Sequence, residues 1–164
     1  LDRSRARWNV LANQTIIAQL DSAPGEERQL SMDNWNGYPA ARRRLLEVLA
    51  RRRPANPVVI TGDIHSNWVA DLKRDFDDPG SPTVAAEFVG TSISSGGDGA
   101  DMTTFGERGL AENPHLKFFN GQRGYVRCEV TPQRWRADYQ VVEFVTQPNA
   151  PLKTRASLAS MVGR

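Results

Sequence analysis

The sequence has little cysteine, little histidine and almost no net charge: one Cys, two His, and a formal charge of +2. Cys128 alone cannot build an internal disulfide framework, and this leaves the redox compartment open. Lys and Arg total 21 against 19 Asp and Glu. Domains dedicated to nucleic-acid binding are usually more basic, and more locally so, and we therefore expect no nucleic-acid specificity.

Long apolar runs are also lacking. The longest runs span only a few residues, so we expect no transmembrane segment and no signal-peptide core. The chain begins with Leu1 instead of Met, as a fragment, a mature form or an excised domain would. Its 164 residues are enough for one domain of ordinary size.

The apolar pattern predicts a mixture of strands and helices. A strand, or a short helix leading into one, is expected within 8–18, and a loop or lid is expected at 21–38. Residues 68–72 fit either a strand or a helical turn. The remaining predicted strands are 58–61, 83–89 and a hairpin of 125–130 with 135–145; the predicted helices are 39–53 and 104–111. This order indicates an α/β or α+β layered domain.

The sharpest chemical feature is Gly62-Asp63-Ile64-His65, which directly follows the β-branched run 58–61. Sheets of α/β proteins place their sites at the carboxyl ends of strands. An Asp oxygen and a His nitrogen together suit a hard or borderline cation. The motif alone leaves two interpretations open: a metal site, or a turn capped by Asp63 with His65 as an ordinary hydrogen-bonded residue.

Four further motifs lie before and after Gly62-Asp63-Ile64-His65 along the chain. They are Trp35-Asn36-Gly37-Tyr38-Pro39, residues 87–97, Asn113-Pro114-His115 and Arg123-Gly124-Tyr125-Val126. The ordered set resembles the C-terminal part of PhoD-type alkaline phosphatases, members of the calcineurin-like metallophosphoesterase superfamily. The resemblance runs from Trp8 to about Gly163. It implies that residues 1–164 are the C-terminal part of a PhoD-like domain, truncated at its N-terminus.

The resemblance carries concrete expectations. The fold would be the C-terminal part of a metallophosphoesterase β-sandwich flanked by helices. The parent protein would hydrolyse phosphate monoesters and diesters with calcium and ferric iron, outside the cytoplasm after twin-arginine export, secreted or in the cell envelope. Asp63 and His65 look like the last metal-binding block, one residue for each metal. Asn36, which replaces the family's Asp, would lie near substrate or metal together with Trp35 and Tyr38.

The family's upstream ligand blocks have no match in this chain. Catalytic metal sites usually need at least three protein ligands. We therefore expect the isolated chain to be inactive and to need the missing N-terminal portion as its partner. The alternative is a non-catalytic binding or interaction module that keeps the fold. A nucleic-acid binder that uses the Arg-rich segment 39–53 is disfavoured by the charge balance and the lack of interleaved aromatics.

Several other residues are expected to have structural roles. Cys128 is predicted as a packed core thiol, because free cysteine behaves as a small hydrophobe. His115 is expected to be structural or exposed. Two interpretations of the Ser/Gly loop 91–99 are possible: it cradles phosphate with its backbone N–H groups, or it is a mobile surface loop. Four tryptophans are predicted as packing anchors: Trp8, Trp35, Trp68 and Trp135.

Overall fold

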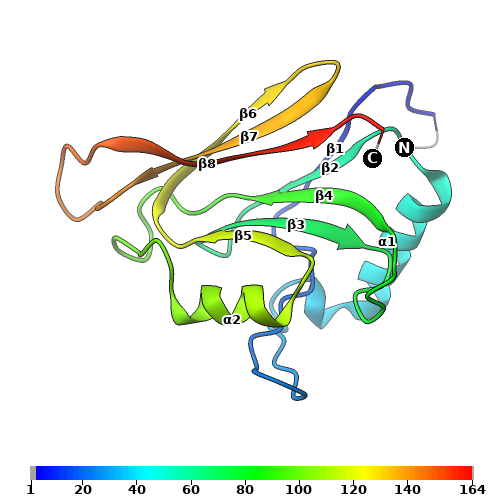
Figure 1. Ribbon diagram of the computed structural model, residues 1–164, viewed down its shortest axis with the longest axis horizontal. Helices are drawn as coiled ribbons and strands as arrows, with labels where there is room; N and C mark the ends of the chain where they lie inside the picture. The colour runs from blue at the N-terminus through cyan, green and yellow to red at the C-terminus, as the bar shows by residue number, and fades with distance from the viewer. Residues whose placement is uncertain (1–2, 164) are drawn as a thin grey trace.

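The computed structural model describes residues 3–163, which form a five-stranded sheet, a three-stranded sheet and two α-helices. The three-stranded sheet covers one face of the five-stranded sheet, and both helices lie on the other face (Figure 1). This confirms the expected mixed α/β fold with two packed sheets and flanking helices. Within 3–163, no helix is long and apolar enough to cross a bilayer.

The five-stranded sheet positions the candidate site. Strands β1, β2 and β4 run parallel, whereas β3 is antiparallel to β4 and β5. The carboxyl ends of β1, β2 and β4 therefore lie at one edge, where β3 begins. The spatial order is β1 (Asn9–Ala12), β2 (Pro57–Thr61), β4 (Thr83–Val89), β3 (Asn67–Lys73) and β5 (Leu116–Asn120).

The two helices begin and end at residues suited to those positions. Helix α1 (Pro39–Arg52) has proline in its first turn and ends at Arg53, whose backbone is left-handed with φ 45°. Helix α2 (Thr104–Glu112) is capped by Thr103, whose hydroxyl accepts a hydrogen bond from the Gly106 N–H at 3.1 Å. Buried leucines of α1, Leu46 and Leu49, join the core beneath the sheet.

Helix α2 lies unusually close to the sheet. A Cβ at Gly106 would be 2.2 Å from the Phe119 ring, and one at Gly109 would be 2.7 Å from the Trp68 ring. Only glycine therefore fits at these two helical positions. Trp68 and Phe119 are register partners on β3 and β5, with ring centroids 4.6 Å apart, and the helix packs directly on both rings.

The second sheet consists of the antiparallel strands β6 (Arg123–Val130), β7 (Arg134–Val142) and β8 (Leu152–Met161). Trp135, Ala137 and Tyr139 on β7 pack against buried side chains of the larger sheet. The Tyr139 hydroxyl donates a hydrogen bond to the Trp68 carbonyl oxygen at 2.8 Å, which links the two sheets. The hairpin predicted near the C-terminus is confirmed.

The structure also corrects several sequence-based expectations. Residues 68–72 are strand, but β5 and β8 were not predicted. Strand β8 is exposed along most of its length, so its apolar alternation is weak. The prediction that Cys128 is packed in the core is wrong, because the residue is exposed. It lies on an edge strand, and within residues 3–163 no further strand pairs with β6 beyond it.

Candidate functional site

Asp63 and His65 lie in the loop that follows β2, at the carboxyl edge of the parallel strands, and both are exposed. Both have left-handed backbone, with φ 69° at Asp63 and 55° at His65. This conformation costs a residue with a Cβ roughly 1 to 2 kcal/mol, and such strain is concentrated at functional sites. The Ile64 N–H closes a tight turn on the Gly62 carbonyl oxygen at 2.8 Å. The loop thus presents both side chains to solvent.

The two side chains have different surroundings. Asp63 lines a cavity of about 250 Å³ with Asn34, Ile64 and Phe105. His65 lies beside Gly96, since a Cβ placed on Gly96 would be 3.9 Å from the His65 Nδ1 atom. His65 is therefore next to the Ser/Gly loop, whereas Asp63 faces the segment that precedes helix α1.

Arg123, at the start of β6, holds the His65 loop against the Ser/Gly loop. Its guanidinium donates hydrogen bonds to the His65 carbonyl oxygen, to the Gly97 carbonyl oxygen at 2.8 Å and to the Thr91 hydroxyl at 3.2 Å. A fourth contact reaches the Ser92 hydroxyl at 3.3 Å. Arg123 is only 6% exposed. Because a planar guanidinium offers several fixed donors, one side chain bridges both loops.

Two buried asparagines reinforce the same edge. The Asn67 Oδ1 atom accepts a hydrogen bond from the Thr91 N–H at 3.0 Å, and its Nδ2 atom donates to Asn120 Oδ1 at 3.1 Å. Asn120 donates in turn to the Asp101 carboxylate at 2.8 Å. Buried amide networks of this kind fix backbone positions when their partners are satisfied. The loop after β4 is therefore tied to β3 and, through Asn120, to β5.

Glu87 in β4 is a fully buried acid beneath this edge. Its two carboxylate oxygens accept hydrogen bonds from the Ile17 N–H at 2.8 Å and the Ala18 N–H at 2.9 Å, and one also accepts from the Thr61 hydroxyl at 3.2 Å. Burial raises the pKa of Glu87 to about 7, although these hydrogen bonds favour the ionised form. Glu87 fixes the irregular segment after β1 next to the end of β2.

The structure places Trp35, Asn36 and Tyr38 in a different environment. Asn36 is 4% exposed; its Oδ1 atom accepts a hydrogen bond from Arg42, and its Nδ2 atom donates to Asn34 Oδ1 at 2.6 Å. Trp35 packs against the core beneath the sheet, and Tyr38 is 66% exposed.

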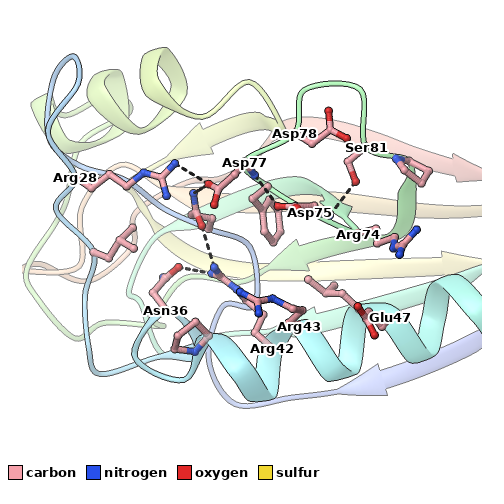
Figure 2. A pocket seen from close by; sticks show the side chains of 16 residues that line it. Arg28, Asn36, Arg42, Arg43, Glu47, Arg74, Asp75, Asp77, Asp78 and Ser81 are labelled. Atoms are coloured by element: carbon pink, nitrogen blue, oxygen red, sulfur yellow. Dashed lines mark hydrogen bonds and ion pairs between the residues drawn. The ribbon is translucent and has the colours of Figure 1, made fainter.

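The cavity beside Asn36 has a volume of about 370 Å³ and does not include Asp63 or His65. Figure 2 shows Arg42 pointing toward Asn36, with Arg28 and Asp77 opposite. Arg28 pairs with Asp77 at 2.6 Å. Asn36 thus contacts an arginine in this chain, while its neighbour Asn34 lines the cavity of Asp63.

The donor chemistry at Asp63 and His65 fits a metal ion in part. A carboxylate oxygen and an imidazole nitrogen are suitable donors, and both belong to a loop held in place by buried hydrogen bonds. Within residues 3–163, no three His, Cys, Asp or Glu side chains are grouped to hold an ion. An ion bound here would take its remaining ligands from elsewhere.

The sequence contains only weak indications of the residues that hold the loops of this edge in place, which are Glu87, Arg123 and Asn67. Glu87 stands alone as an acid in the apolar run 83–89, and this marks a buried charge with a specific partner. Arg123 and Asn67 belong to strand ends, where polar residues are common, so no pattern revealed their partners. All three act through contacts between segments far apart in sequence.

Comparison with known proteins places these features in a family. The sequence model of the PhoD-like phosphatases matches residues 1–139. Alkaline phosphatase D of Bacillus subtilis is 49% identical over 157 residues, which are 96% of this chain and 27% of that protein. A solved structure described as "Structure of PhoD" matches with a TM-score of 0.93 and 48% identity, over 98% of this chain and 31% of its own. The chain thus spans under a third of either relative, and it belongs to the PhoD-like phosphatase family.

Proposed function

We propose that this chain is the C-terminal part of a metal-dependent phosphatase that hydrolyses phosphate monoesters and diesters. The observation that carries the proposal is the Asp63–His65 loop, with two exposed metal-type ligands at the carboxyl edge of the sheet. The chain that bears this loop is 49% identical to an alkaline phosphatase. On this proposal the parent acts outside the cytoplasm, secreted or in the cell envelope.

Asp63 and His65 would each hold one ion of a mixed centre of calcium and ferric iron. Bound cations would neutralise the anionic ester and activate an oxygen nucleophile. Asp63 offers the hard oxygen that calcium prefers. Arg123 and Asn67 keep the two loops of this edge in register, so the ligands need not reorganise when substrate arrives. The loop 91–99 would lie next to the bound ester.

The first experiment measures phosphatase activity of the complete parent protein with p-nitrophenyl phosphate and bis-p-nitrophenyl phosphate. Asp63→Ala and His65→Ala are expected to lower both activities and to reduce the metal content per chain. Arg44→Ala, at an exposed position on α1, is the matched control and should behave like the wild type. Full activity and full metal content in both ligand variants would overturn the assignment.

The second experiment concerns the 164-residue chain on its own. We expect no phosphatase activity from it, because Asp63 and His65 are too few to fix a catalytic ion. Robust metal-dependent turnover by the isolated chain would contradict the proposal that it holds only part of the catalytic site. Equal metal uptake by the wild type, Asp63→Ala and His65→Ala, together with an inactive parent, would instead favour a binding module.

A further inference from the structure

The cavity beside Asp63 connects the proposed metal centre to the space between helix α2 and the segment 21–34. Asp63 and Ile64 of the loop after β2 line it together with Phe105 of α2 and Asn34 of that segment. Figure 1 shows the segment, in blue, beside α2. A group held in this cavity therefore lies next to a side chain that we assign to a metal ion.

Four of the side chains that line this cavity are apolar: Ile16, Leu20, Ile64 and Phe105. Ile16 and Leu20 belong to the buried core, whereas Phe105 is 40% exposed. The Phe105 ring packs edge-on against Trp68, with ring centroids 5.7 Å apart. The apolar wall is thus held in place before a ligand binds, which avoids the cost of ordering it.

The size and charge of the cavity favour a neutral organic group. An apolar protein cavity of about 150 Å³ holds a benzene ring, so a cavity of about 250 Å³ has room for one ring and its substituents. The charged residues among its described lining are Asp33 and Asp63, without a lysine or arginine. An ion would neutralise Asp63, but Asp33 would still repel a second anionic group.

We propose that this cavity is the subsite for the organic group of the phosphate ester, and that it selects a neutral apolar group such as a phenyl ring. The inference rests on the proposed function, because it takes Asp63 as a ligand of the ion that binds the phosphoryl group. His65, in the same turn, lies beside the Ser/Gly loop instead. The phosphoryl group would lie over the turn, with its organic substituent directed away from the Ser/Gly loop and against Phe105.

Phosphonates test the subsite without turnover, because carbon replaces the ester oxygen and leaves no ester bond to hydrolyse. Calorimetry measures the binding of phenylphosphonate and methylphosphonate to the complete, metal-loaded parent. Phenylphosphonate should bind at least about tenfold more tightly, because its ring is buried in the cavity. Phe105→Ala should reduce this preference to about threefold or less.

Met102→Ala is the matched control. Met102 is also an apolar residue close to the start of α2 and is 41% exposed, but it does not line the cavity. This variant should keep the preference of the wild type. Equal binding of the two phosphonates by the wild type, or an unchanged preference in Phe105→Ala, would overturn the subsite. Tighter binding of 2-aminoethylphosphonate than of phenylphosphonate would also overturn it, because Asp33 and not the apolar wall would then select the group.

A second variant covers the case in which Phe105→Ala does not fold without its contact to Trp68. Ser31 is exposed and lines the cavity, so Ser31→Phe should fill the space and remove the preference. A preference retained in Ser31→Phe would contradict the proposal. Equal metal-dependent binding of both phosphonates would defeat the subsite and leave the proposed function standing. The absence of any metal-dependent phosphonate binding would defeat the proposed function and the subsite together.

Discussion

The guanidinium of Arg123 donates a hydrogen bond to the carbonyl oxygen of His65, which lies 58 residues earlier in the chain. The same guanidinium holds the Gly97 carbonyl and two hydroxyls. One buried cation thus connects the start of the smaller sheet to both loops at the carboxyl edge of the larger sheet. The position of His65 consequently depends on the packing of the two sheets.

Replacement of Arg123 should loosen this edge. We expect Arg123→Ala to lower the free energy of unfolding by about 2 kcal/mol, because two partly buried carbonyl oxygens lose a charged donor. Arg123→Lys should recover only part of this, since one ammonium group cannot reach all four acceptors. Urea unfolding measures the loss, and amide hydrogen exchange at Ser66 and Thr91 should become faster.

Arg28→Ala is the control for this prediction. Arg28 also pairs through its guanidinium, but its side chain is 53% exposed, and surface pairs contribute about 0 to 1 kcal/mol. Equal losses in Arg123→Ala and Arg28→Ala would show that the buried contacts of Arg123 add nothing.

The left-handed backbone of His65 predicts an unusual order of stability. His65→Gly should be more stable than His65→Ala by about 1 kcal/mol, because glycine adopts φ 55° without a Cβ penalty. Both variants remove the imidazole, so both should lose the proposed metal contact of this side chain to the same extent. Thermal unfolding measures the difference.

The order should reverse at Ser94, an exposed loop residue that is not among those with positive φ. There the glycine variant should be the less stable of the pair by about 0.5 to 1 kcal/mol, because glycine loses more backbone entropy on folding. The same order at both positions would argue against strain at His65.

Glu87 predicts a specific dependence of stability on pH. Its pKa is about 7 in the folded chain and 4.5 in a model peptide, so the folded state holds the proton more tightly. Stability should fall as pH rises from 4.5 to 7 and level off above, with a total change of about 3 kcal/mol. Urea unfolding across this range measures the slope.

Glu87→Gln should flatten this slope, although its overall stability should be lower because an amide N–H₂ faces backbone donors. Glu143→Gln, at an exposed surface position, should keep the slope of the wild type. A wild-type slope in Glu87→Gln would assign the pH dependence to other groups.

Two glycines of the Ser/Gly loop should differ sharply. Gly97 and Gly99 have similar φ values of 74° and 73°, but a Cβ on Gly99 would be 2.0 Å from the Gly121 carbonyl oxygen, whereas Gly97 has open space. Gly97→Ala should cost about 1 kcal/mol from backbone strain alone. Gly99→Ala should lower the free energy of unfolding clearly more, and chemical denaturation of both variants measures the difference. Equal costs would mean that the loop moves to avoid the contact.

The sequence was most informative where local chemistry decides the structure. Proline at 39 begins α1, and the β-branched run 58–61 lies in β2 with Val58 and Val59 buried, because their neighbours in sequence suffice to determine these elements. Strand β5 was missed because it forms by pairing with the distant strand β3. Strand β8 pairs with its neighbour β7, but it was missed because it lacks a clear buried face.

The candidate site divides in the same way. The Asp63–His65 motif is contiguous and follows a buried strand, so it was visible in the sequence. The bonds that hold this loop come from Arg123, and the Asn67–Asn120 pair links β3 to β5; both are contacts between distant segments. Asn36 was singled out by resemblance, but its environment is set by Arg42, six residues later on α1.

The two glycines of α2 have a consequence for the order of folding. Gly106 and Gly109 weaken the helix by about 2 kcal/mol relative to alanine, and a nine-residue helix is marginal in water in any case. Helix α2 therefore gains its stability only after Trp68 and Phe119 have been brought together on adjacent strands. Its formation reports that β3 and β5 have already paired, so α2 is expected to be among the last elements to become ordered.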